Sequence, residues 1–465
     1  MGSLLDQNDA AAHEVAVVMV PFPAQGHLNQ LMQLSCLLSR NGLQVHYIGS
    51  SVHNRQARVR ANGLSPQDLS KIHFHDIPIP SFESPSPNPD SSRKFPGQLQ
   101  PAWDASLSQR QPVFEFLQEL AKKYKKIVII HDPMMASVVQ DVASIPNAES
   151  FVFNCFSVFT KATHTFERIG KRFPLELPKE MPPFEGCASN EVVEFLALQS
   201  EYLKYRAGDI YNSSRLMEGP YLDLLANKEI VGDRKSWAIG PIIPPKLASS
   251  DSPPKCLQWL DQQEPNSVIY VSFGTTTSLT DEEIKELALG LEQSRQKFIW
   301  VLRDADKADI FAGEARRAEL PKGFEERVEG VGIVVRDWAP QPEILAHQAT
   351  GGFMSHCGWN SCIESVTMGV PIAAWPMHSD QPRNAFLVTE ILKLGIVVKE
   401  WDPSGEVVRA QAIANVVKTL MASEDGDEIR KRAEKLGAAM RQSTEEGGVS
   451  RLELESFIIH INNGK

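Results

Sequence analysis

The feature that most constrains the fold is an alternation of apolar strand runs and helical patterns that stops at one Pro- and Ser-rich segment and then starts again. Short β-branched runs bounded by turn residues predict buried parallel strands, each followed by a helix. The order βαβα on both sides of the segment predicts an α/β protein with two doubly wound, Rossmann-like parallel sheets. The strand runs are 15–20, 44–50, 127–130 and 150–154 before it, and 267–275, 298–303, 332–338 and 351–356 after it.

The segment that interrupts the alternation, PPKLASSDSPPK at 244–255, is the predicted linker. A chain of 465 residues exceeds the usual size of one hydrophobic core. We therefore expect an N-terminal domain over 1–243, a C-terminal domain over 256–440 and an amphipathic final segment over 441–465. In such folds ligands bind at the carboxyl ends of strands, so the default site is a cleft between the two domains. Residues 191–211 are predicted to be helical.

Composition narrows the classes of partner. A net charge of −11 argues against nucleic acid or an anionic membrane, so any phosphate must be held by local groups. The six cysteines form no CxxC pair, which is typical of buried thiols in a reducing compartment. The polar, acidic N-terminus is not a secretory signal, and the apolar run VAVVMVPF is too short to span a bilayer. We expect a cytoplasmic protein without stable membrane insertion.

The stretch SHCGWNSCIE, 355–364, concentrates reactive side chains, and two reactive interpretations are weak. His347, His356, Cys357 and Cys362 are close in sequence, but their spacing fits no familiar zinc pattern. A thiol nucleophile needs a nearby base, and neighbouring residues of a strand such as His356 and Cys357 point to opposite faces. Both cysteines are common kinds of packing residue.

A third interpretation of this stretch is an anion site. A strand ending at His356, a turn at Gly358 and a helix beginning near Ser361 present backbone N–H groups at a helix N-terminus. The side chains of Asn360 and Ser361 and the imidazole add neutral donors, which suits an acidic protein that binds a diphosphate. Equally, Ser361 and Glu364 form an S-x-x-E capping box that only starts the helix. The spacing leaves both alternatives open.

Flanking residues extend the anion site along successive strand ends. Trp338 follows a strand, where an indole can stack on a flat base, although a half-buried core tryptophan is the commoner role. Asp380 and Gln381 follow another strand and offer an acceptor and an amide for sugar hydroxyls, or turn chemistry before Pro382. Together these residues place groups for a base, a ribose, a diphosphate and a sugar in one row.

The 44 residues from Trp338 to Gln381 resemble the signature box of plant UDP-sugar-dependent small-molecule glycosyltransferases, and PFPAQGHLNQ near the N-terminus is also similar to that family. The resemblance implies two Rossmann-like domains facing across a cleft (the GT-B type), with a terminal helix that crosses back to the first domain. It also implies a donor site in the C-terminal domain. The implied roles are uracil binding by Trp338 and Ala339, ribose binding by Gln341 and Glu364, diphosphate binding by Thr275, His356, Gly358, Asn360 and Ser361, and sugar contact by Trp359, Asp380 and Gln381.

Longer stretches, among them HFHDIPIPSFESPSPNP and WPMHSDQPRNA, are most similar to the zeatin O-glucosyltransferase subgroup. This resemblance implies that glucose moves from UDP-glucose to a hydroxyl of a cytokinin. Flavonoids, isoflavones or other phenolics remain alternative acceptors. A final Gln in the box is associated with UDP-glucose, and UDP-xylose remains an alternative donor.

The resemblance further assigns the general base to His27, in the turn after the first strand, and its orienting acid to Asp132. A neutral imidazole can take the proton of an acceptor hydroxyl while the carboxylate stabilises the imidazolium. One in-line displacement then inverts the anomeric carbon. A metal-binding D-x-D is offered by DAD at 304–306, but that stretch is predicted to be solvated, and the helix N-terminus at 358–361 can stabilise the leaving diphosphate instead. We expect no metal and no cofactor.

The acceptor pocket is the least determined part. Phe22, Met134, Phe156, His378 and the segment 191–205 are candidate lining residues, although core packing explains them equally well. A monomer is expected. Two rival classes are an NAD-dependent oxidoreductase, which lacks its G-x-G-x-x-G here, and a silent ligand-binding relative, which would lack His27 or Asp132.

Overall fold

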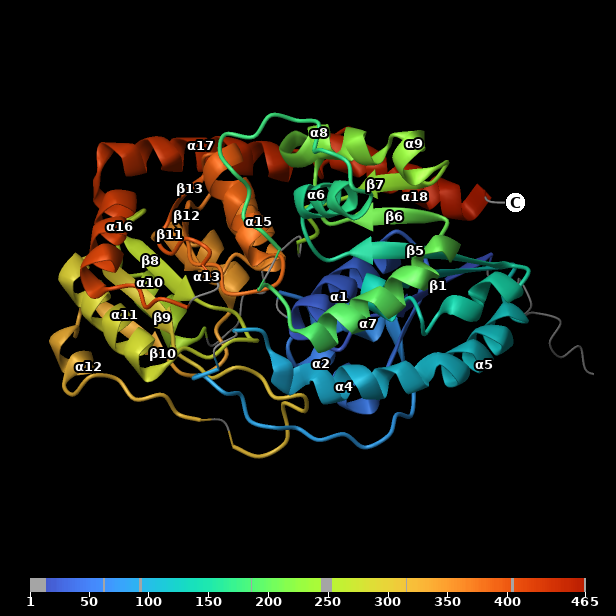
Figure 1. The fold of residues 1–465 in the computed structure, drawn as a ribbon, viewed down its shortest axis with the longest axis horizontal. Coiled ribbons are helices and arrows are strands. Elements are labelled where there is room, and N and C mark those ends of the chain that lie inside the picture. Colours follow the sequence, from blue (N-terminus) through green and yellow to red (C-terminus); the bar gives the residue numbers. More distant parts are fainter. Residues whose placement is uncertain are drawn as a thin grey trace, which may run out of the picture.

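A computed structural model describes residues 14–61, 63–91, 94–184, 186–243, 253–314, 316–402 and 405–463. Two parallel sheets lie side by side, each covered by helices on both faces (Figure 1). The first has seven strands in the order β3-β2-β1-β4-β5-β6-β7, and the second has six in the order β10-β9-β8-β11-β12-β13. The predicted pair of doubly wound parallel sheets is confirmed.

The first sheet is built around β1 (Val15–Val20), which is buried along its whole length because helices cover both faces. Its neighbours β2 and β4 pair with it in parallel register, so the carboxyl ends of the three strands lie at one edge. The other elements of this half are α1 (Gln25–Arg40), β2 (Gln44–Gly49), α2 (Ser51–Val59), α3 (Pro66–Ser70), β3 (Ile72–Asp76), α4 (Gln100–Ser106), α5 (Arg110–Ala121), β4 (Lys126–His131), β5 (Ala148–Asn154), α6 (Val158–Arg168), α7 (Asn190–Tyr202), β6 (Gly208–Tyr211), α8 (Arg215–Leu225), α9 (Lys228–Val231) and β7 (Lys235–Ala238).

The second sheet has β8 (Val268–Ser272) and β11 (Thr350–Ser355) at its centre. Its first long helix begins at Asp281, where Thr280 and Glu283 form a capping box. The other elements are α10 (Lys255–Leu260), α11 (Asp281–Ser294), β9 (Lys297–Val301), α12 (Phe324–Arg327), β10 (Gly332–Val335), α13 (Gln341–Ala346), α14 (Trp359–Met368), β12 (Ile372–Ala374), α15 (Gln381–Phe386), β13 (Gly395–Val397), α16 (Ala410–Ala422), α17 (Glu424–Gln442) and α18 (Val449–Asn463).

One predicted helix was wrong in part. Over 191–211, α7 ends at Tyr202, and residues 208–211 form β6, which pairs with β5 and β7. The strand is short, and its Asp209 interrupts the apolar pattern by pairing with Arg206 at 2.9 Å. The strand conformation of β6 therefore depends more on pairing with its neighbouring strands than on its own sequence.

The linker predicted at 244–255 lies largely outside the described residues, which resume at 253. The first sheet ends with β7, and α10 begins the second half at Lys255. The boundaries at 243 and 256 stay predictions.

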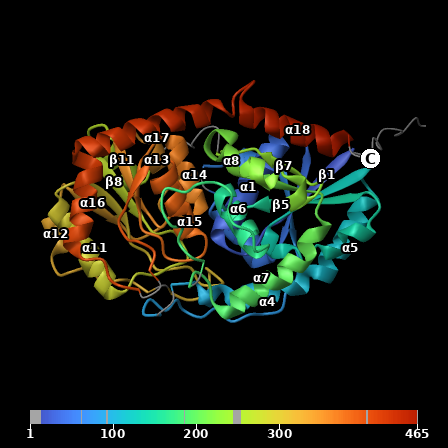
Figure 2. The ribbon, with the colours of Figure 1, turned by 45° about the horizontal axis from the view of Figure 1, so that its top comes forward.

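The last two helices connect the halves. Helix α17 packs against α14 of the second half and α8 of the first, and α18 lies against β7 on the far side (Figure 2). Phe457 and Ile461 of α18 are fully buried in the core of the first domain, where the Phe457 and Phe151 ring centroids are 5.3 Å apart. The predicted return of the terminal helix is confirmed. In the part of the chain that the structure describes, no helix has the length and apolar character needed to cross a membrane.

Candidate active site

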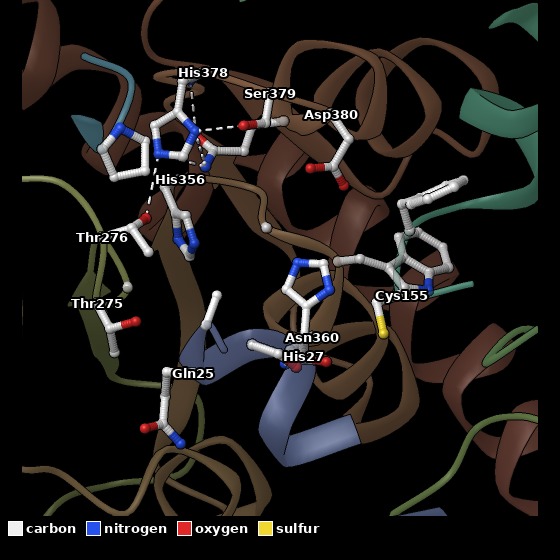
Figure 3. A pocket seen from close by; sticks show the side chains of 18 of the residues that line it. Gln25, His27, Cys155, Thr275, Thr276, His356, Asn360, His378, Ser379 and Asp380 are labelled. Carbon is white, nitrogen blue, oxygen red and sulfur yellow. Dashed lines mark hydrogen bonds between the residues drawn. The ribbon is translucent and has the colours of Figure 1, made fainter. Parts of the chain in front are cut away.

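One cavity of about 400 Å³ lies between the two halves, and strand ends from both sheets open onto it (Figure 3). Apart from Asp132, which lies behind His27, every sequence-predicted site residue lines it, on both the donor and the acceptor side. The predicted residues that line it are Phe22, His27, Met134, Phe156, Thr275, Trp338, Ala339, Gln341, His356, Gly358, Trp359, Asn360, Ser361, Glu364, His378, Asp380 and Gln381.

The first-domain wall carries a His–Asp pair. Nδ1 of His27, near the start of α1, lies 2.6 Å from Oδ2 of Asp132, directly after β4. Asp132 is fully buried, and its second oxygen accepts the backbone N–H of Met134 at 2.9 Å. The thiol of Cys155 donates to Oδ2 at 3.3 Å. Because Nδ1 is engaged, Nε2 is the nitrogen of His27 that can take a proton from a ligand.

The carboxylate also sets the charge of the imidazole. Burial alone would lower the pKa of His27, but the attraction and hydrogen bond of Asp132, helped by Asp380, outweigh it and raise the pKa above its ordinary value. The pair therefore stabilises the imidazolium, the state that forms when the base has accepted a proton.

On the opposite wall, His356 is held between two glycines. A Cβ at Gly274 would lie 2.6 Å from its Nε2, and one at Gly358 would lie 2.5 Å from it, so both positions exclude a side chain. Burial lowers the pKa of His356 to about 4, which keeps it neutral. Its Nδ1 is buried with no hydrogen-bond partner among the described residues. A neutral imidazole with a free nitrogen fits the predicted uncharged donor to an anion.

The chain turns sharply after this histidine. Cys357 has φ of 64°, a left-handed conformation that few residues without a glycine's freedom adopt. The turn lets α14 begin at Trp359, with Gly358 as its N-cap and no side-chain cap. Cys357 and Cys362 are fully buried in an apolar cluster that joins the two halves, as expected of packing residues.

The capping-box alternative for this helix is wrong. The helix was expected to begin near Ser361 but begins two residues earlier, so Ser361 lies in its first turn. The Oγ of Ser361 accepts a hydrogen bond from Nε2 of Gln341 at 3.0 Å. The same nitrogen donates to Glu364 at 2.9 Å. Burial raises the pKa of Glu364 to about 7. The three side chains thus form one hydrogen-bonded group on the cavity wall.

Trp338 is covered by arginines. The guanidinium carbon of Arg60, from α2's C-terminal end, lies 4.5 Å from the indole centroid, and that of Arg303 lies 5.6 Å from it. Both pair with Asp306: Arg60 at 2.5 and 3.0 Å, Arg303 at 2.7 Å. The predicted solvation of DAD is therefore wrong, because Asp304 (bonded to Ser278) and Asp306 are buried and held by side chains from both halves.

The predicted sugar contacts lie at the ends of β11 and β12. Oε1 of Gln381 accepts the backbone N–H groups of Met377 and His378, at 2.9 and 3.1 Å, and Asp380 accepts from Asn384 at 2.6 Å. The indole N–H of Trp359 donates across the domain interface to the Asn212 carbonyl at 2.9 Å. The Trp359 indole nitrogen is thus already engaged.

Asn360 also bridges the halves, since its amide donates to the Gly26 carbonyl at 2.8 Å. Thr275 lines the cavity at the end of β8, and its carbonyl accepts the N–H of Asp306 at 2.7 Å. The two walls of the cavity are therefore tied together beside His27.

The acceptor half is more aromatic than the sequence indicated. Phe22 packs 5.1 Å from Trp103 and 5.2 Å from His27, and Phe95 lies 5.6 Å from His378 (centroid distances). Phe95 lies near the end of a long irregular segment and Trp103 in α4 just after it, so no motif placed them here. The other lining residues that the sequence left unassigned include Cys155, Lys161, His164 and Phe184. Val192, Leu196, Gln199, Ser200 and Leu203 come from the predicted 191–205 segment.

No metal cluster forms from the histidines and cysteines of the 347–362 region within the described residues. His347 instead lies 3.2 Å from Asp261, away from the cavity lining. The described residues bring one trio of potential ligands together, His27, Asp132 and Cys155, within 4.8 Å, and their atoms are already joined by hydrogen bonds.

A His–Asp pair lies across a cleft from a neutral histidine and a helix N-terminus, between two Rossmann-like domains, which is the arrangement expected of a glycosyltransferase that uses a nucleotide-linked sugar. Comparison with known proteins gives the family. Residues 13–244 match the model "Glycosyltransferase, N-terminal domain", and residues 248–424 match "UDP-glucoronosyl and UDP-glucosyl transferase". The chain belongs to the UDP-glycosyltransferase family.

Individual relatives agree along nearly the whole length. A zeatin O-glucosyltransferase of Phaseolus lunatus is 52% identical over 99% of this chain and 100% of its own. A zeatin O-xylosyltransferase of Phaseolus vulgaris is also 52% identical, over 97% of this chain and 98% of its own. The crystal structure of a UDP-bound transferase from Siraitia grosvenorii matches with a TM-score of 0.77 and 30% identity, covering 96% of this chain and 100% of that one.

Proposed function

We propose that this UDP-glycosyltransferase moves glucose from UDP-glucose to the side-chain hydroxyl of zeatin. The observation that carries the chemistry is the His27–Asp132 pair at 2.6 Å, across one cavity from the neutral His356 cradle. The two relatives at 52% identity that act on zeatin support the acceptor. Gln381 as the last residue of the signature box supports glucose as the sugar.

In the proposed reaction, Nε2 of His27 removes the hydroxyl proton of the acceptor while Asp132 stabilises the imidazolium. The acceptor oxygen attacks the anomeric carbon from the face opposite UDP, and the bond to the diphosphate oxygen breaks. A single displacement inverts the configuration, so the α-linked donor gives a β-glycoside. Charge on the leaving diphosphate is stabilised by the N-terminus of α14 and by the His356 imidazole.

The donor roles follow the row of strand ends. We assign uracil binding to Trp338 and the Ala339 backbone, and ribose binding to Gln341 and Glu364, which the structure joins by a hydrogen bond of 2.9 Å. The guanidinium groups of Arg60 and Arg303 already lie over the Trp338 indole, so uracil stacking requires a part of the ring surface that they leave open. The remaining assignments are diphosphate binding by Thr275, His356, Gly358, Asn360 and Ser361, sugar contact by Trp359, Asp380 and Gln381, and acceptor contact by Phe22, Met134, Phe156 and His378.

UDP-xylose is a second candidate donor, because one of the relatives at 52% identity transfers xylose by name. We further propose that the enzyme works as a monomer, needs no cofactor and resides in the cytoplasm. The compartment is supported by the six cysteines, all of which are free and buried.

The deciding experiment is mass spectrometry of reactions that pair UDP-glucose or UDP-xylose with trans-zeatin, cis-zeatin and a flavonol. We expect a hexose adduct of a zeatin isomer as the main product and none with His27→Ala. A pentose adduct as the main product would show that UDP-xylose, and not UDP-glucose, is the preferred donor. Exclusive transfer to the flavonol would overturn the proposed acceptor.

A further inference from the structure

Two nitrogen donors beside the first-domain side of the cavity have no hydrogen-bond acceptor among the described residues. Helix α6 contributes Lys161, and helix α7 contributes Gln199. Both residues line the cavity. Neither has a role in the dyad or in the donor cradle.

The amide of Gln199 is fixed in orientation. Its Oε1 accepts the backbone N–H of Ser137 at 2.9 Å, so Nε2 is identified as the opposite, donating atom. The side chain is only 2% exposed, and Nε2 has no hydrogen-bond partner in the part of the chain that the structure describes. Buried donors without a partner are uncommon in folded proteins and call for an explanation.

Lys161 is half-buried beside the same cavity. The one acid whose charge acts on it among the described residues is Asp209, which is already paired with Arg206 at 2.9 Å. No described carboxylate lies within salt-bridge distance of its Nζ. Its Nζ lies over the Phe156 ring, 5.9 Å from the ring centroid, in a cation–π contact. Burial lowers the pKa of Lys161 to about 8, so it carries a proton near neutral pH while lacking a counter-ion.

The surrounding walls fit a flat ring. Phe22, Phe156 and Phe184 line the same cavity, and aromatic side chains favour stacked or edge-on contact with a planar ligand. An ammonium and an amide N–H₂ are donors only, so the ligand atoms that satisfy them must be acceptors, and a ring that supplies these acceptors itself must carry in-plane lone pairs. A benzene ring has none, whereas the ring nitrogens of a purine have several.

We propose that Lys161 and Gln199 are specificity-determining residues that donate hydrogen bonds to ring nitrogens of a heteroaromatic acceptor while its hydroxylated side chain reaches His27. This inference rests on the proposed function and deepens it, because it names the part of a cytokinin that the enzyme recognises. It separates recognition of the adenine ring from the chemistry at the hydroxyl. The UDP-sugar plays no part in this recognition of the adenine ring.

The test combines variants with a matched pair of ligands. N⁶-isopentenyladenine carries an adenine and the five-carbon chain without the hydroxyl, so it binds without turnover; N-isopentenylaniline replaces the adenine by benzene. Dissociation constants are measured by calorimetry in the presence of UDP for Lys161→Met, Lys161→Arg and Gln199→Glu. Gln199→Glu keeps the oxygen that binds the Ser137 N–H and removes the donor. Lys171→Met, an exposed site outside the cavity, is the control.

We expect Lys161→Met and Gln199→Glu each to weaken binding of the adenine ligand by roughly tenfold to hundredfold, with less than threefold change for the aniline. Lys161→Arg should restore most of the affinity, and the control should match wild type. Equal weakening of both ligands, or no weakening of either, overturns the inference, as does failure of the wild type to prefer adenine. Because binding requires no transfer, a wild type that binds the adenine ligand tightly but does not glucosylate zeatin would refute the proposed function alone.

Discussion

Nδ1 of His27 and Oδ2 of Asp132 lie 2.6 Å apart, although 105 residues separate them in the sequence. Parallel pairing of β1 with β4 brings the two strand ends together, so the dyad is a direct product of sheet order. The carboxylate is fully buried while the imidazole side chain is 29% exposed, which leaves the base accessible and its partner protected.

Replacing Asp132 by Asn should shift the acid limb of the pH–rate profile. His27 must be neutral to accept a proton, so activity is lost as the pH falls through its raised pKa. Without the Asp132 carboxylate, burial is opposed by the smaller attraction of Asp380 alone, so the pKa of His27 falls and the acid limb of kcat/KM moves to lower pH. The plateau rate should also fall by roughly 10²–10⁴. Asp141→Asn, at a surface pair with Arg110, is the control; an unchanged acid limb in Asp132→Asn would contradict the assigned role.

His27→Ala should reduce kcat by roughly 10²–10⁴ and leave the KM for UDP-glucose nearly unchanged, because the base contacts the acceptor and not the nucleotide. Steady-state kinetics with the best acceptor measures both parameters. A variant that keeps the full rate would show that another group takes the proton.

Gly358→Ala should weaken donor binding. Gly358 has φ of −58°, so alanine is tolerated by the backbone, but its Cβ would lie 2.5 Å from Nε2 of His356 and must displace the ring. We expect the KM for UDP-glucose to rise at least about tenfold, equivalent to loss of one good hydrogen bond to a charged ligand. Gly219→Ala in α8, where the added Cβ meets no atom within 4 Å, is the matched control. Equal KM values for the two variants would argue against His356 as a diphosphate donor.

Arg60→Met should destabilise the protein. The change removes an ion pair to Asp306 whose side chains are 12% and 5% exposed. Among the described residues, Arg303 is then the charged partner that Asp306 keeps. We expect the free energy of unfolding to fall by roughly 1–3 kcal/mol in a urea titration, which is less than for an acid left unpaired. Arg40→Met, which breaks the more exposed pair with Asp68, should cost less than about 1 kcal/mol. The reverse order would show that the interdomain pair contributes little.

Chelation of divalent metals should leave the activity unchanged, since the charge on the leaving diphosphate is assigned to the α14 N-terminus and His356. The measurement is transfer from UDP-glucose with and without EDTA. Loss of activity in EDTA that Mn²⁺ restores would require a metal in the mechanism.

Much of the fold was readable from periodicity, because strands buried on both faces appear as continuous apolar runs, as at 15–20. The gathering of the predicted donor-side residues on one cavity wall was readable from a local motif, since 338–381 spans successive strand ends of one sheet. Short β6 was missed because its pairing partners, not its own composition, make it a strand.

Contacts between the two halves were not predictable in the same way. Nothing in the sequence connects Arg60 with Trp338 and Asp306, and the burial of Asp306 depends on that contact. Lys161 and Gln199, whose donor nitrogens lack an acceptor among the described residues, are likewise recognisable only once α6 and α7 are seen to contribute to one cavity. The turn was predicted at Gly358, whereas the left-handed residue is its neighbour Cys357, a residue type that gives no sequence signal for that conformation.

The return of α18 to the first domain has a consequence for biosynthesis. Phe457 and Ile461 are fully buried beside β-strand residues that leave the ribosome hundreds of residues earlier. The domain that carries His27 is therefore translated first but is completed only after α18 has been synthesised. Until α18 is made, part of the apolar surface of this domain stays exposed. We therefore expect chaperones to bind a nascent chain that is stalled before α18.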